Sequence, residues 1–362
     1  MSLSVGIVGL PNVGKSTLLN ALTRAGAEAS NYPFCTIEQN VGVTPVPDPD
    51  LHRLASLLTP QSVQPATVRF VDIAGLVAGA SRGEGLGNRF LGHIREVDAI
   101  LHVVRCFESQ DVVHATGVPD PVGDVEVVET ELLLADLETA ERALDRWRKA
   151  RKVGKDVGKL EEAAFTRAVV ALQAGQPVRS LELQEEERQA LGEARFLTAK
   201  PCLFLANTDE KDAAGAGERV LALREAKGTE RVLPVSVAIE EEVSQLEPGE
   251  QQAFLEELGL EHTALDLVVT ACYRLLDLIT YYTIAHEKLS AWPLRRGGTA
   301  AEAAGQIHSD MMRGFIRAEV MALDDLLRLG SRQALHDQGL IRTVGREHVV
   351  NDKDVLHIHF KP

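Results

Sequence analysis

The sequence lacks several features that mark membrane, secreted and zinc-binding proteins. None of its hydrophobic runs approaches the ~18 uninterrupted apolar residues of a membrane-spanning helix. The first residues, MSLSVGIVGLPNVGK, have neither the basic start nor the small-residue cleavage site of a signal peptide. The four cysteines lie far apart and form no CxxC pair, which argues against a zinc site and a disulfide framework. We therefore expect a cytoplasmic protein with reduced thiols and no membrane partner.

Basic charge is also scarce. The chain has 38 lysines and arginines against 53 acidic residues, which gives a formal net charge of −15. By itself, such a balance disfavours nucleic acid as a partner. The length of 362 residues allows two or three domains with their own cores, and a hydrophobic fraction of 45% is ordinary for a globular chain. The charge is uneven, however, and one segment is strongly basic.

The strongest motif follows the first predicted strand. SVGIVG at 4–9 is apolar enough for a buried parallel strand and runs into GLPNVGKST, which fits G-x-x-x-x-G-K-[ST] and opens a predicted helix. The glycines let successive backbone N–H groups point at phosphate oxygens at the helix N-terminus. Lys15 would reach the β- and γ-phosphates and assist catalysis, and the Ser16 hydroxyl would bind Mg²⁺. The expected nucleotide contacts of this loop are Asn12, Val13, Gly14, Lys15, Ser16 and Thr17.

A second motif, TVRFVDIAGL, ends a β-rich run in Asp72 and continues to Gly75. A carboxylate at the end of a buried strand can hold the water shell of Mg²⁺, and a nearby glycine can offer its N–H to a γ-phosphate. Asp72 as an ordinary turn residue is the alternative, which its position after a P-loop disfavours. Thr36 stands where a switch threonine would contact Mg²⁺, although such threonines also occur in inert loops. The predicted metal ligands are Ser16, Thr36 and Asp72.

The group that would orient water for hydrolysis is less obvious. Signalling GTPases place a glutamine directly after DxxG, whereas this chain has Leu76, which cannot orient water. Five glycines between positions 79 and 92 predict a mobile segment. His93, just past that segment, is the nearest imidazole in sequence and is our candidate for the catalytic group. A helix histidine with no catalytic part fits the sequence equally well.

In GTPases, guanine is read by Asn-Lys-x-Asp after a strand. Here LFLANTDEKD supplies Asn207, but Thr208 stands at the lysine position and Glu210 at the aspartate position. Thr208 is too short to pack over the base, and Glu210 is one methylene too long for the guanine edge. Losing a charge-assisted pair costs on the order of 1.5–3 kcal/mol, so the sequence argues that guanine is not favoured. The expected base contacts are Asn207, Thr208, Glu210 and, after the next strand, Ser236 and Val237.

Strand-like runs at 99–107, 201–207 and 231–237 complete an alternation of strands and helices. The fold class is therefore α/β, with a mostly parallel sheet. Ligands bind outside the carboxyl ends of the strands in such sheets, which would bring the loops described above to one edge. Between 125 and 200, periodic leucine, alanine and charge predict a helical hairpin inserted into the P-loop domain.

The predicted insert carries a concentrated basic tip. Residues 142–159 hold eight basic residues against two acids. Such a run is usually only a solvated face, but in an acidic protein it is a credible contact for a phosphate backbone. The basic residues are Arg142, Arg146, Arg148, Lys149, Arg151, Lys152, Lys155 and Lys159.

The chain changes character near residue 280. Short strands, a hairpin signal at NDKD and one helix near 299–312 indicate a separate small α+β domain over 280–362. The P-loop nucleotide-binding domain would then comprise 1–124 and 201–279, on either side of the insert at 125–200.

Together these motifs resemble the YchF family of Obg-like P-loop ATPases. The resemblance covers essentially the whole chain and is carried by GLPNVGKST, NYPFCTIEQNVG, DIAGLVAGASRGEGLGNRFL, TELLLADLETAE, the Asn-x-x-Glu motif and a tail around AWPLRRGGTAAEAAGQIHSDMMRGFIRAEV. It implies that the insert is an antiparallel coiled coil, that the last domain is a TGS domain, and that the protein associates with ribosomes. It also implies a preference for ATP over GTP and a catalytic histidine after DxxG, which matches His93.

We therefore expect an Mg²⁺-dependent ATPase that acts as a slow conformational switch on the ribosome, ribosomal RNA or another RNA-rich partner. It would work as a monomer and bind GTP more weakly than ATP. Lys15, the P-loop amides and Mg²⁺ would stabilise in-line attack of water on the γ-phosphate. Two alternatives stay open: a GTPase of the same build, and an RNA-binding adaptor whose nucleotide is structural and turns over negligibly.

Overall fold

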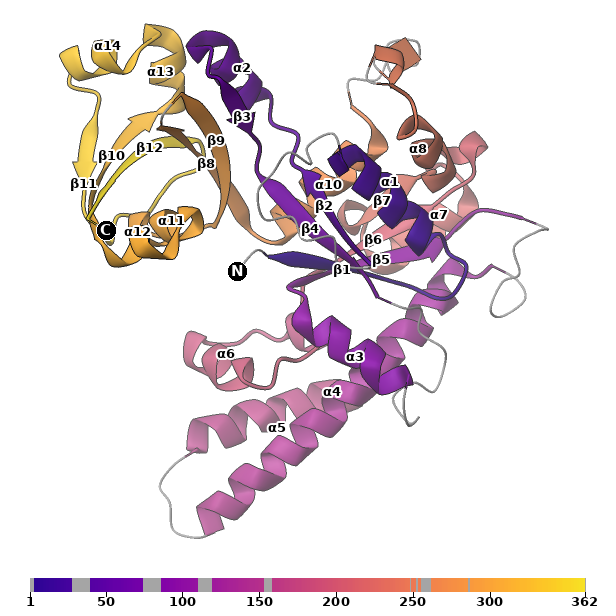
Figure 1. Cartoon of the computed structure of the whole chain (residues 1–362). Coiled ribbons are helices and arrows are strands. Elements are labelled where there is room, and N and C mark those ends of the chain that lie inside the picture. Colours follow the sequence, from indigo (N-terminus) through magenta and orange to yellow (C-terminus); the bar gives the residue numbers. More distant parts are fainter. Residues whose placement is uncertain are drawn as a thin grey trace.

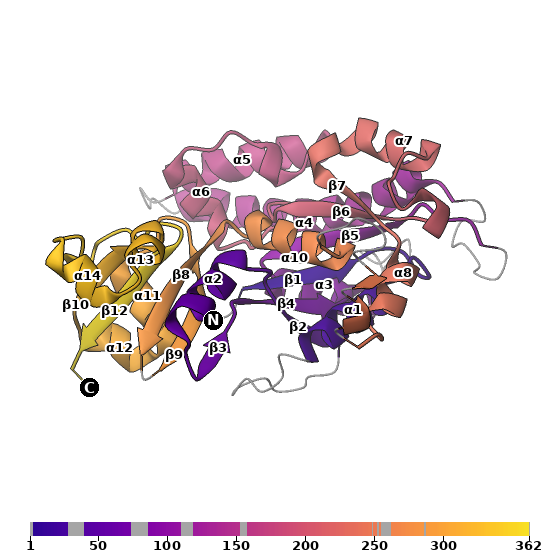
Figure 2. The same cartoon turned by 90° about the horizontal axis from the view of Figure 1, so that it is seen from above.

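The computed structural model has three parts: a domain around a six-stranded sheet, a pair of long helices that projects from it, and a C-terminal domain built on a second six-stranded sheet (Figure 1). Figure 2 shows the C-terminal domain at one end of the molecule. The structure describes residues 3–27, 40–73, 86–109, 119–152, 158–247, 249–251, 253–254, 262–285 and 287–361.

The first sheet has the strand order β2-β4-β1-β5-β6-β7. All its strands run parallel except β2, which pairs antiparallel with β4 at the edge. Strands β1 and β5 are buried along their whole length, as their continuous hydrophobic runs predict. The five strands predicted for this domain are confirmed, whereas β2 was not predicted. The bounds are β1 Ser4–Val8, β2 Val41–Pro45, β4 Thr67–Asp72, β5 Ala99–Arg105, β6 Cys202–Asn207 and β7 Val232–Val235.

Helices complete the core of this domain. Helix α1 packs on β2, β4 and α8, and α10 packs across β4, β5, β6 and β7. Helix α3 buries the side chains of Phe90, Leu91 and Ile94 in the same core. The bounds are α1 Lys15–Ala27, α3 Leu86–Glu96, α7 Glu218–Lys227, α8 Val237–Val243 and α10 Ala264–Leu275, with short 3-10 turns at Val178–Ser180, Glu210–Asp212 and Thr229–Arg231.

The predicted insert is an antiparallel helical hairpin of α4 (Pro121–Lys152) and α5 (Lys159–Gln173), followed by α6 (Glu185–Gly192) (Figure 1). Its first helix does not begin at the predicted boundary of 125. The first half of α4 belongs to the P-loop domain, because Val128 and Leu132 lie in the core of the sheet. A separate core for the hairpin begins only at Ala140. None of the helices described is long and apolar enough to cross a membrane.

Two polar clusters fix the base of this hairpin. Buried Asp136 accepts hydrogen bonds from the backbone N–H groups of Leu197 (2.9 Å) and Thr198 (2.7 Å) and from the Thr198 hydroxyl (2.7 Å). Glu129, also on α4, accepts from Arg179 (3.0 Å) and from Lys227 on α7 (2.7 Å). Because these bonds join the hairpin to the returning chain and to α7, the hairpin is held at its root.

The C-terminal sheet has the order β11-β10-β12-β8-β9-β3. The hairpin predicted at NDKD is wrong: that turn leads into β12, which pairs with β10 and β8, and the actual hairpin joins β8 to β9. The single helix predicted near 299–312 is two helices, since the chain is extended at His308. The bounds are β8 Leu278–Ala285, β9 Lys288–Arg295, α11 Ala300–Ile307, α12 Ser309–Arg313, β10 Phe315–Ala322, α13 Leu323–Leu329, α14 Arg332–Asp337, β11 Arg342–Val344 and β12 Asp354–Phe360.

One segment of the N-terminal half belongs structurally to the C-terminal domain. Between β2 and β4 the chain forms α2 (Pro49–Leu58) and β3 (Ser62–Gln64), and β3 pairs in parallel with β9. The Tyr282 hydroxyl donates to the Asp48 carboxylate at 3.0 and 3.1 Å, and Lys353 pairs with Asp50 at 2.7 Å. The predicted division of the chain places this segment in the P-loop domain, whereas it packs as part of the second sheet (Figure 1).

Candidate nucleotide site

The phosphate-binding loop follows β1 and opens α1, as predicted. Gly14 has a φ of 100°, and a Cβ there would lie 2.5 Å from the side-chain nitrogen of Asn207. A Cβ on Gly9 would lie 2.4 Å from the carbonyl oxygen of Val103. Val13 is buried in the core, while Asn12 is exposed at the tip of the loop. The two glycines therefore let the loop lie close against the ends of β5 and β6.

Lys15 is buried at the start of α1, and its ammonium donates to the Leu10 carbonyl oxygen at 2.8 Å. Burial lowers the pKa of this ammonium below its ordinary value, and the negative charge of Asp72 opposes the shift. The loop itself therefore only partly offsets the cost of burying the positive charge of Lys15. An anion bound in the loop would offset the rest, as a phosphate group does in a phosphate-binding site.

Two of the three predicted metal ligands meet in the structure. The Ser16 hydroxyl donates to Asp72 Oδ2 at 3.0 Å, although the two residues are 56 positions apart in sequence. The other carboxylate oxygen of Asp72 is buried and has no hydrogen-bond partner among the described residues. A hydroxyl beside a carboxylate with an unsatisfied oxygen fits Mg²⁺, which binds oxygen ligands. Thr36, Gly75 and Leu76 lie outside the described residues. So does the first part, 79–85, of the segment predicted to be mobile over 79–92, whereas its second part, 86–92, is helical in α3.

A cavity of about 790 Å³ opens beside the loop, where the base is expected to bind. Asn207 holds its two sides together, since its amide donates to the Val13 carbonyl oxygen at 2.9 Å and accepts from the Val237 N–H at 3.2 Å. The P-loop, the end of β6 and the start of α8 therefore form one unit. The predicted residues that line the cavity are Asn12, Gly14, Thr17, Asn207, Thr208, Glu210, Ser236 and Val237.

Hydroxyl groups, two carboxamides, one lysine and four carboxylates give this cavity its polar character; the carboxylates are those of Glu108, Asp209, Glu210 and Glu241. The hydroxyl oxygens of Thr208 and Ser236 are buried, and neither has a hydrogen-bond partner among the described residues. Both residues line the cavity, so a ligand can supply the missing partners. Glu210 lies exposed at the rim. A base in this cavity therefore meets groups that can donate as well as accept.

One wall of the cavity was not foreseen from the sequence. Phe107 and Glu108 line it from the loop after β5. Arg105 is 2% exposed, lies with its guanidinium carbon 4.5 Å from the centre of the Phe107 ring, and donates to the carbonyl oxygens of Phe107 (3.4 Å) and Ser109 (3.3 Å). The available signal was the position of these residues at the carboxyl end of a strand, beside the strand that carries Asn207.

His93 is not among the residues that line the nucleotide cavity. It lies exposed on α3, the helix that anchors itself through Phe90, Leu91 and Ile94. The structure joins the P-loop to Asp72 through Ser16 and to Asn207 through the carbonyl oxygen of Val13. The side chains of Lys15, Ser16 and Asp72 do not line that cavity either, so the catalytic role of His93 stays a prediction.

Known proteins similar to this chain share its whole length. Residues 4–120 match a family described as a 50S ribosome-binding GTPase, and residues 278–361 match the C-terminal YchF GTPase family, described as a protein of unknown function. The protein named ribosome-binding ATPase YchF of Haemophilus ducreyi is 48% identical over 362 residues, which cover 99% of each chain. The one of Bacillus subtilis is 46% identical over 364 residues, covering 99% of this chain and 100% of the relative.

A solved structure agrees with the fold of all three parts. The YchF GTPase of Schizosaccharomyces pombe superposes with a TM-score of 0.89 at 33% sequence identity, covering 99% of this chain and 98% of that one. The bacterial relatives are named as ATPases and this structure as a GTPase. The names of these relatives thus agree that a nucleoside triphosphate is hydrolysed, and they differ on whether its base is adenine or guanine.

Proposed function

The chain belongs to the YchF family of P-loop ATPases. We propose that it is an Mg²⁺-dependent ATPase that binds the ribosome and changes conformation with the nucleotide that it holds. The observation that carries the proposal is the built nucleotide site. There Asn207 joins the base cavity to the P-loop, and the Ser16 hydroxyl meets the carboxylate of Asp72. The relatives from H. ducreyi and B. subtilis bear the name ribosome-binding ATPase.

Lys15 is the residue that would bind the β- and γ-phosphates. In the structure its ammonium is held by one carbonyl oxygen, that of Leu10, inside a low-dielectric loop. Charge-assisted bonds to phosphate oxygens would replace that bond and relieve the unfavourable burial of the cation. The N-terminus of α1 adds backbone N–H groups aimed at the same phosphates. These groups would also stabilise the charge that develops during attack on the γ-phosphate.

Ser16 and Asp72 would hold Mg²⁺, together with Thr36. Bound there, the ion would neutralise negative charge on the phosphate oxygens. The protein positions the two ligands: β4 fixes the Asp72 carboxylate beside α1, 3.0 Å from the Ser16 hydroxyl. The buried Asp72 oxygen without a partner supports this assignment.

Adenine is the base that we propose for the cavity. Its edge offers a donor, the exocyclic amine, beside a ring acceptor. The buried hydroxyls of Thr208 and Ser236 can each donate and accept, while Glu210 can accept one bond from the amine. Guanine needs two acceptors from one carboxylate, and Glu210 lies exposed at the rim rather than enclosed in the cavity. The ring of Phe107 supplies an apolar wall.

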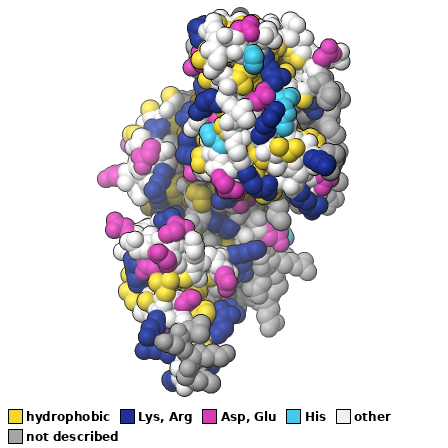
Figure 3. Space-filling model, turned by 90° about the vertical axis from the view of Figure 1, so that its left-hand side faces the viewer, with side chains coloured by type: hydrophobic (Ala, Val, Ile, Leu, Met, Phe, Trp, Pro, Cys, Tyr) yellow, Lys and Arg dark blue, Asp and Glu magenta, His cyan; other side chains and the backbone are white. Residues whose placement is uncertain are grey.

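The tip of the hairpin is the surface that we propose for ribosomal RNA. Among its basic residues, Arg142 pairs with Glu138 (3.0 Å) and Arg151 with Glu162 (2.9 Å). Figure 3 shows lysine and arginine side chains gathered at this end of the molecule. Phosphate groups of RNA would find unpaired cations there. The exposed residues that form no ion pair within the described part of the chain are Arg146, Arg148, Lys149 and Lys152.

Co-sedimentation with purified ribosomes tests the proposal directly. The affinity should differ by at least about fivefold between ADP and a non-hydrolysable ATP analogue, because a switch must bind its partner better in one nucleotide state. ATP turnover should also change when ribosomes are added. Equal affinity in both nucleotide states would instead identify an adaptor with a structural nucleotide. No co-sedimentation in either state would refute the ribosomal partner.

A further inference from the structure

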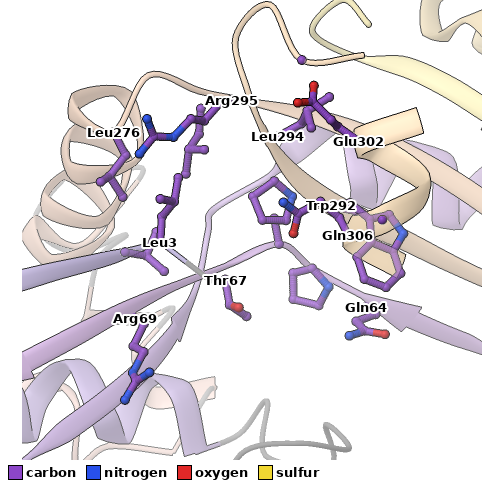
Figure 4. Close-up of a pocket in the computed structure, with 18 of the residues that line it drawn as sticks. Leu3, Gln64, Thr67, Arg69, Leu276, Trp292, Leu294, Arg295, Glu302 and Gln306 are labelled. Atoms are coloured by element: carbon purple, nitrogen blue, oxygen red, sulfur yellow. The ribbon is translucent and has the colours of Figure 1, made fainter. Parts of the chain in front are cut away.

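A second cavity, of about 740 Å³, lies where the P-loop domain meets the C-terminal domain (Figure 4). It is lined by Leu3, just before β1, and by Thr67 and Arg69 at the start of β4, so it lies at the amino-terminal edge of the parallel strands. The nucleotide site lies at the opposite edge, and no group assigned to ATP hydrolysis lines this cavity. Its volume is within the range of sites that bind small molecules.

One end of this cavity offers an aromatic ring and two carboxamides, from Trp292, Gln64 and Gln306 (Figure 4). The indole N–H of Trp292 donates to the Thr283 hydroxyl at 2.9 Å, which fixes the ring within the β8–β9 hairpin. Neither carboxamide forms a hydrogen bond to another described residue, and each carries both donors and an acceptor. Such a group of side chains can hold a planar ring and pair with polar atoms on its edge.

The other end offers positive charge. Arg295 and Arg69 lie there, beside the apolar side chains of Leu3 and Leu276 (Figure 4). The Arg295 side chain is 64% exposed, and its guanidinium is 3.5 Å from Asp98, a loose pair that leaves donors for a ligand.

The one acidic residue in the lining, Glu302, is already engaged. Its carboxylate accepts a hydrogen bond from the Thr299 N–H at 2.7 Å and so caps α11. The carboxylate keeps its negative charge, but Arg69 and Arg295 give the lining two positive charges against this one, which favours an anion.

We propose that this cavity is a second ligand site, which takes a planar heterocycle bearing an anionic group and of the size of a nucleoside monophosphate. The ring lies at the end of Trp292, Gln64 and Gln306, and the anionic group lies at the end of Arg295 and Arg69. Because both domains line the cavity, the ligand binds only when they are arranged as in this structure. Occupancy therefore stabilises this arrangement.

One strand connects this cavity to the proposed ATPase site. Arg69 and Asp72 lie on the same strand, β4, which carries the cavity at its start and the proposed metal ligand at its end. Where ATP binds one domain arrangement better than another, a ligand that selects an arrangement changes the affinity for ATP, and ATP changes the affinity for that ligand by the same factor.

Intrinsic fluorescence gives a specific readout, since the chain has only two tryptophans. The Trp147→Phe variant leaves Trp292 as the single fluorophore. Its nucleotide site is first saturated with a non-hydrolysable ATP analogue, and AMP, GMP, CMP and UMP are then titrated separately. At least one should change Trp292 emission in a saturable manner, whereas ribose 5-phosphate, which has no ring to place beside the indole, should not.

Two further variants locate the binding. Arg295→Gln and Gln306→Ala, each in the Trp147→Phe background, should weaken the saturable change by about tenfold. The matched control is Arg328→Gln, an exposed arginine of α13 that pairs with Asp325 outside the cavity. No saturable change with any monophosphate up to about 5 mM overturns the proposal. An equal response to ribose 5-phosphate, or an unchanged affinity in both cavity variants, overturns it as well.

Discussion

At the scale of single residues, the base cavity depends on Arg105, a buried cation that is not among the residues lining the cavity. It holds the loop after β5 through two carbonyl oxygens and lies against the Phe107 ring. A lysine cannot replace these contacts, because it lacks the planar guanidinium that donates to both carbonyl oxygens and lies against the ring. Arg105→Lys should therefore weaken ATP binding by about tenfold but leave tripolyphosphate binding unchanged, because tripolyphosphate has no base to hold.

Calorimetry with both ligands makes this measurement, and Phe107→Leu is its companion variant. The two substitutions should give less than additive losses when combined, since they act on the same wall. Equal loss of ATP and tripolyphosphate binding would show that Arg105 supports the whole domain rather than the base cavity.

His93 is the candidate catalytic residue, and its role stays a prediction. It follows DxxG, lies exposed on α3 and does not line the base cavity. If α3 brings it to the γ-phosphate during turnover, His93→Ala should lower the single-turnover rate by ~10²–10⁴-fold with little change in ATP affinity. A rate within about threefold of wild type would make it an ordinary surface histidine.

At the scale of elements, the hairpin α4–α5 is a long arm fixed at its root and charged at its tip. Replacing Arg148, Lys149, Arg151 and Lys152 with alanine should weaken ribosome co-sedimentation and flatten its salt dependence. Each lost phosphate contact should reduce the slope of log affinity against log salt concentration by roughly 0.7–0.9. Arg151 should contribute least, because Glu162 already pairs with it.

The control for the hairpin replaces two exposed arginines outside the tip, Arg188 and Arg328, which pair with Glu185 and Asp325. It should leave the salt slope unchanged. A slope that falls equally in both variants would mean that net charge, not the tip, governs ribosome binding.

The elements also show what the sequence could predict. Strands β1, β4, β5, β6 and β7 were predicted because buried parallel strands are continuous hydrophobic runs followed by functional turns. Strand β2 was missed because its five residues, VGVTP, alternate between half-buried and buried positions at a sheet edge. Strand β3 was missed because two of its three residues are exposed, and its pairing with β9 depends on residues more than 220 positions away.

The site was predictable for the same kind of reason. The P-loop follows β1, Asp72 ends β4 and Asn207 ends β6, and parallel strands bring their carboxyl ends together. The wall formed by Phe107 was not predictable, because no local pattern distinguishes it from any aromatic residue after a strand. Nor could spacing alone show that Asn207 would bond to Val13 and Val237 rather than only to a base.

At the scale of the whole molecule, the two sheets are joined by the segment that leaves β2, forms α2 and β3, and returns as β4. Burial and the Asp48 carboxylate raise the pKa of the Tyr282 hydroxyl, which therefore stays protonated and donates to Asp48 throughout the neutral range. Tyr282→Phe should lower the free energy of unfolding by about 1–2 kcal/mol.

The same substitution should speed amide hydrogen exchange in α2 more than in α1. Mass spectrometry of deuterium uptake resolves the two helices. Unchanged exchange in α2 would mean that the β3–β9 pairing alone holds this segment to the C-terminal domain.

The central claim, that this site is built for ATP, is tested most directly by calorimetric titration of the protein with ATP and with GTP, each as a non-hydrolysable analogue with Mg²⁺. We predict that the ATP analogue binds at least about tenfold more tightly, because Thr208 and Glu210 do not reproduce the guanine-reading pair. Lys15→Ala should remain folded and abolish tight binding of both analogues, which ties the signal to the P-loop. A GTP analogue that binds as tightly as the ATP analogue, or more tightly, would contradict the account.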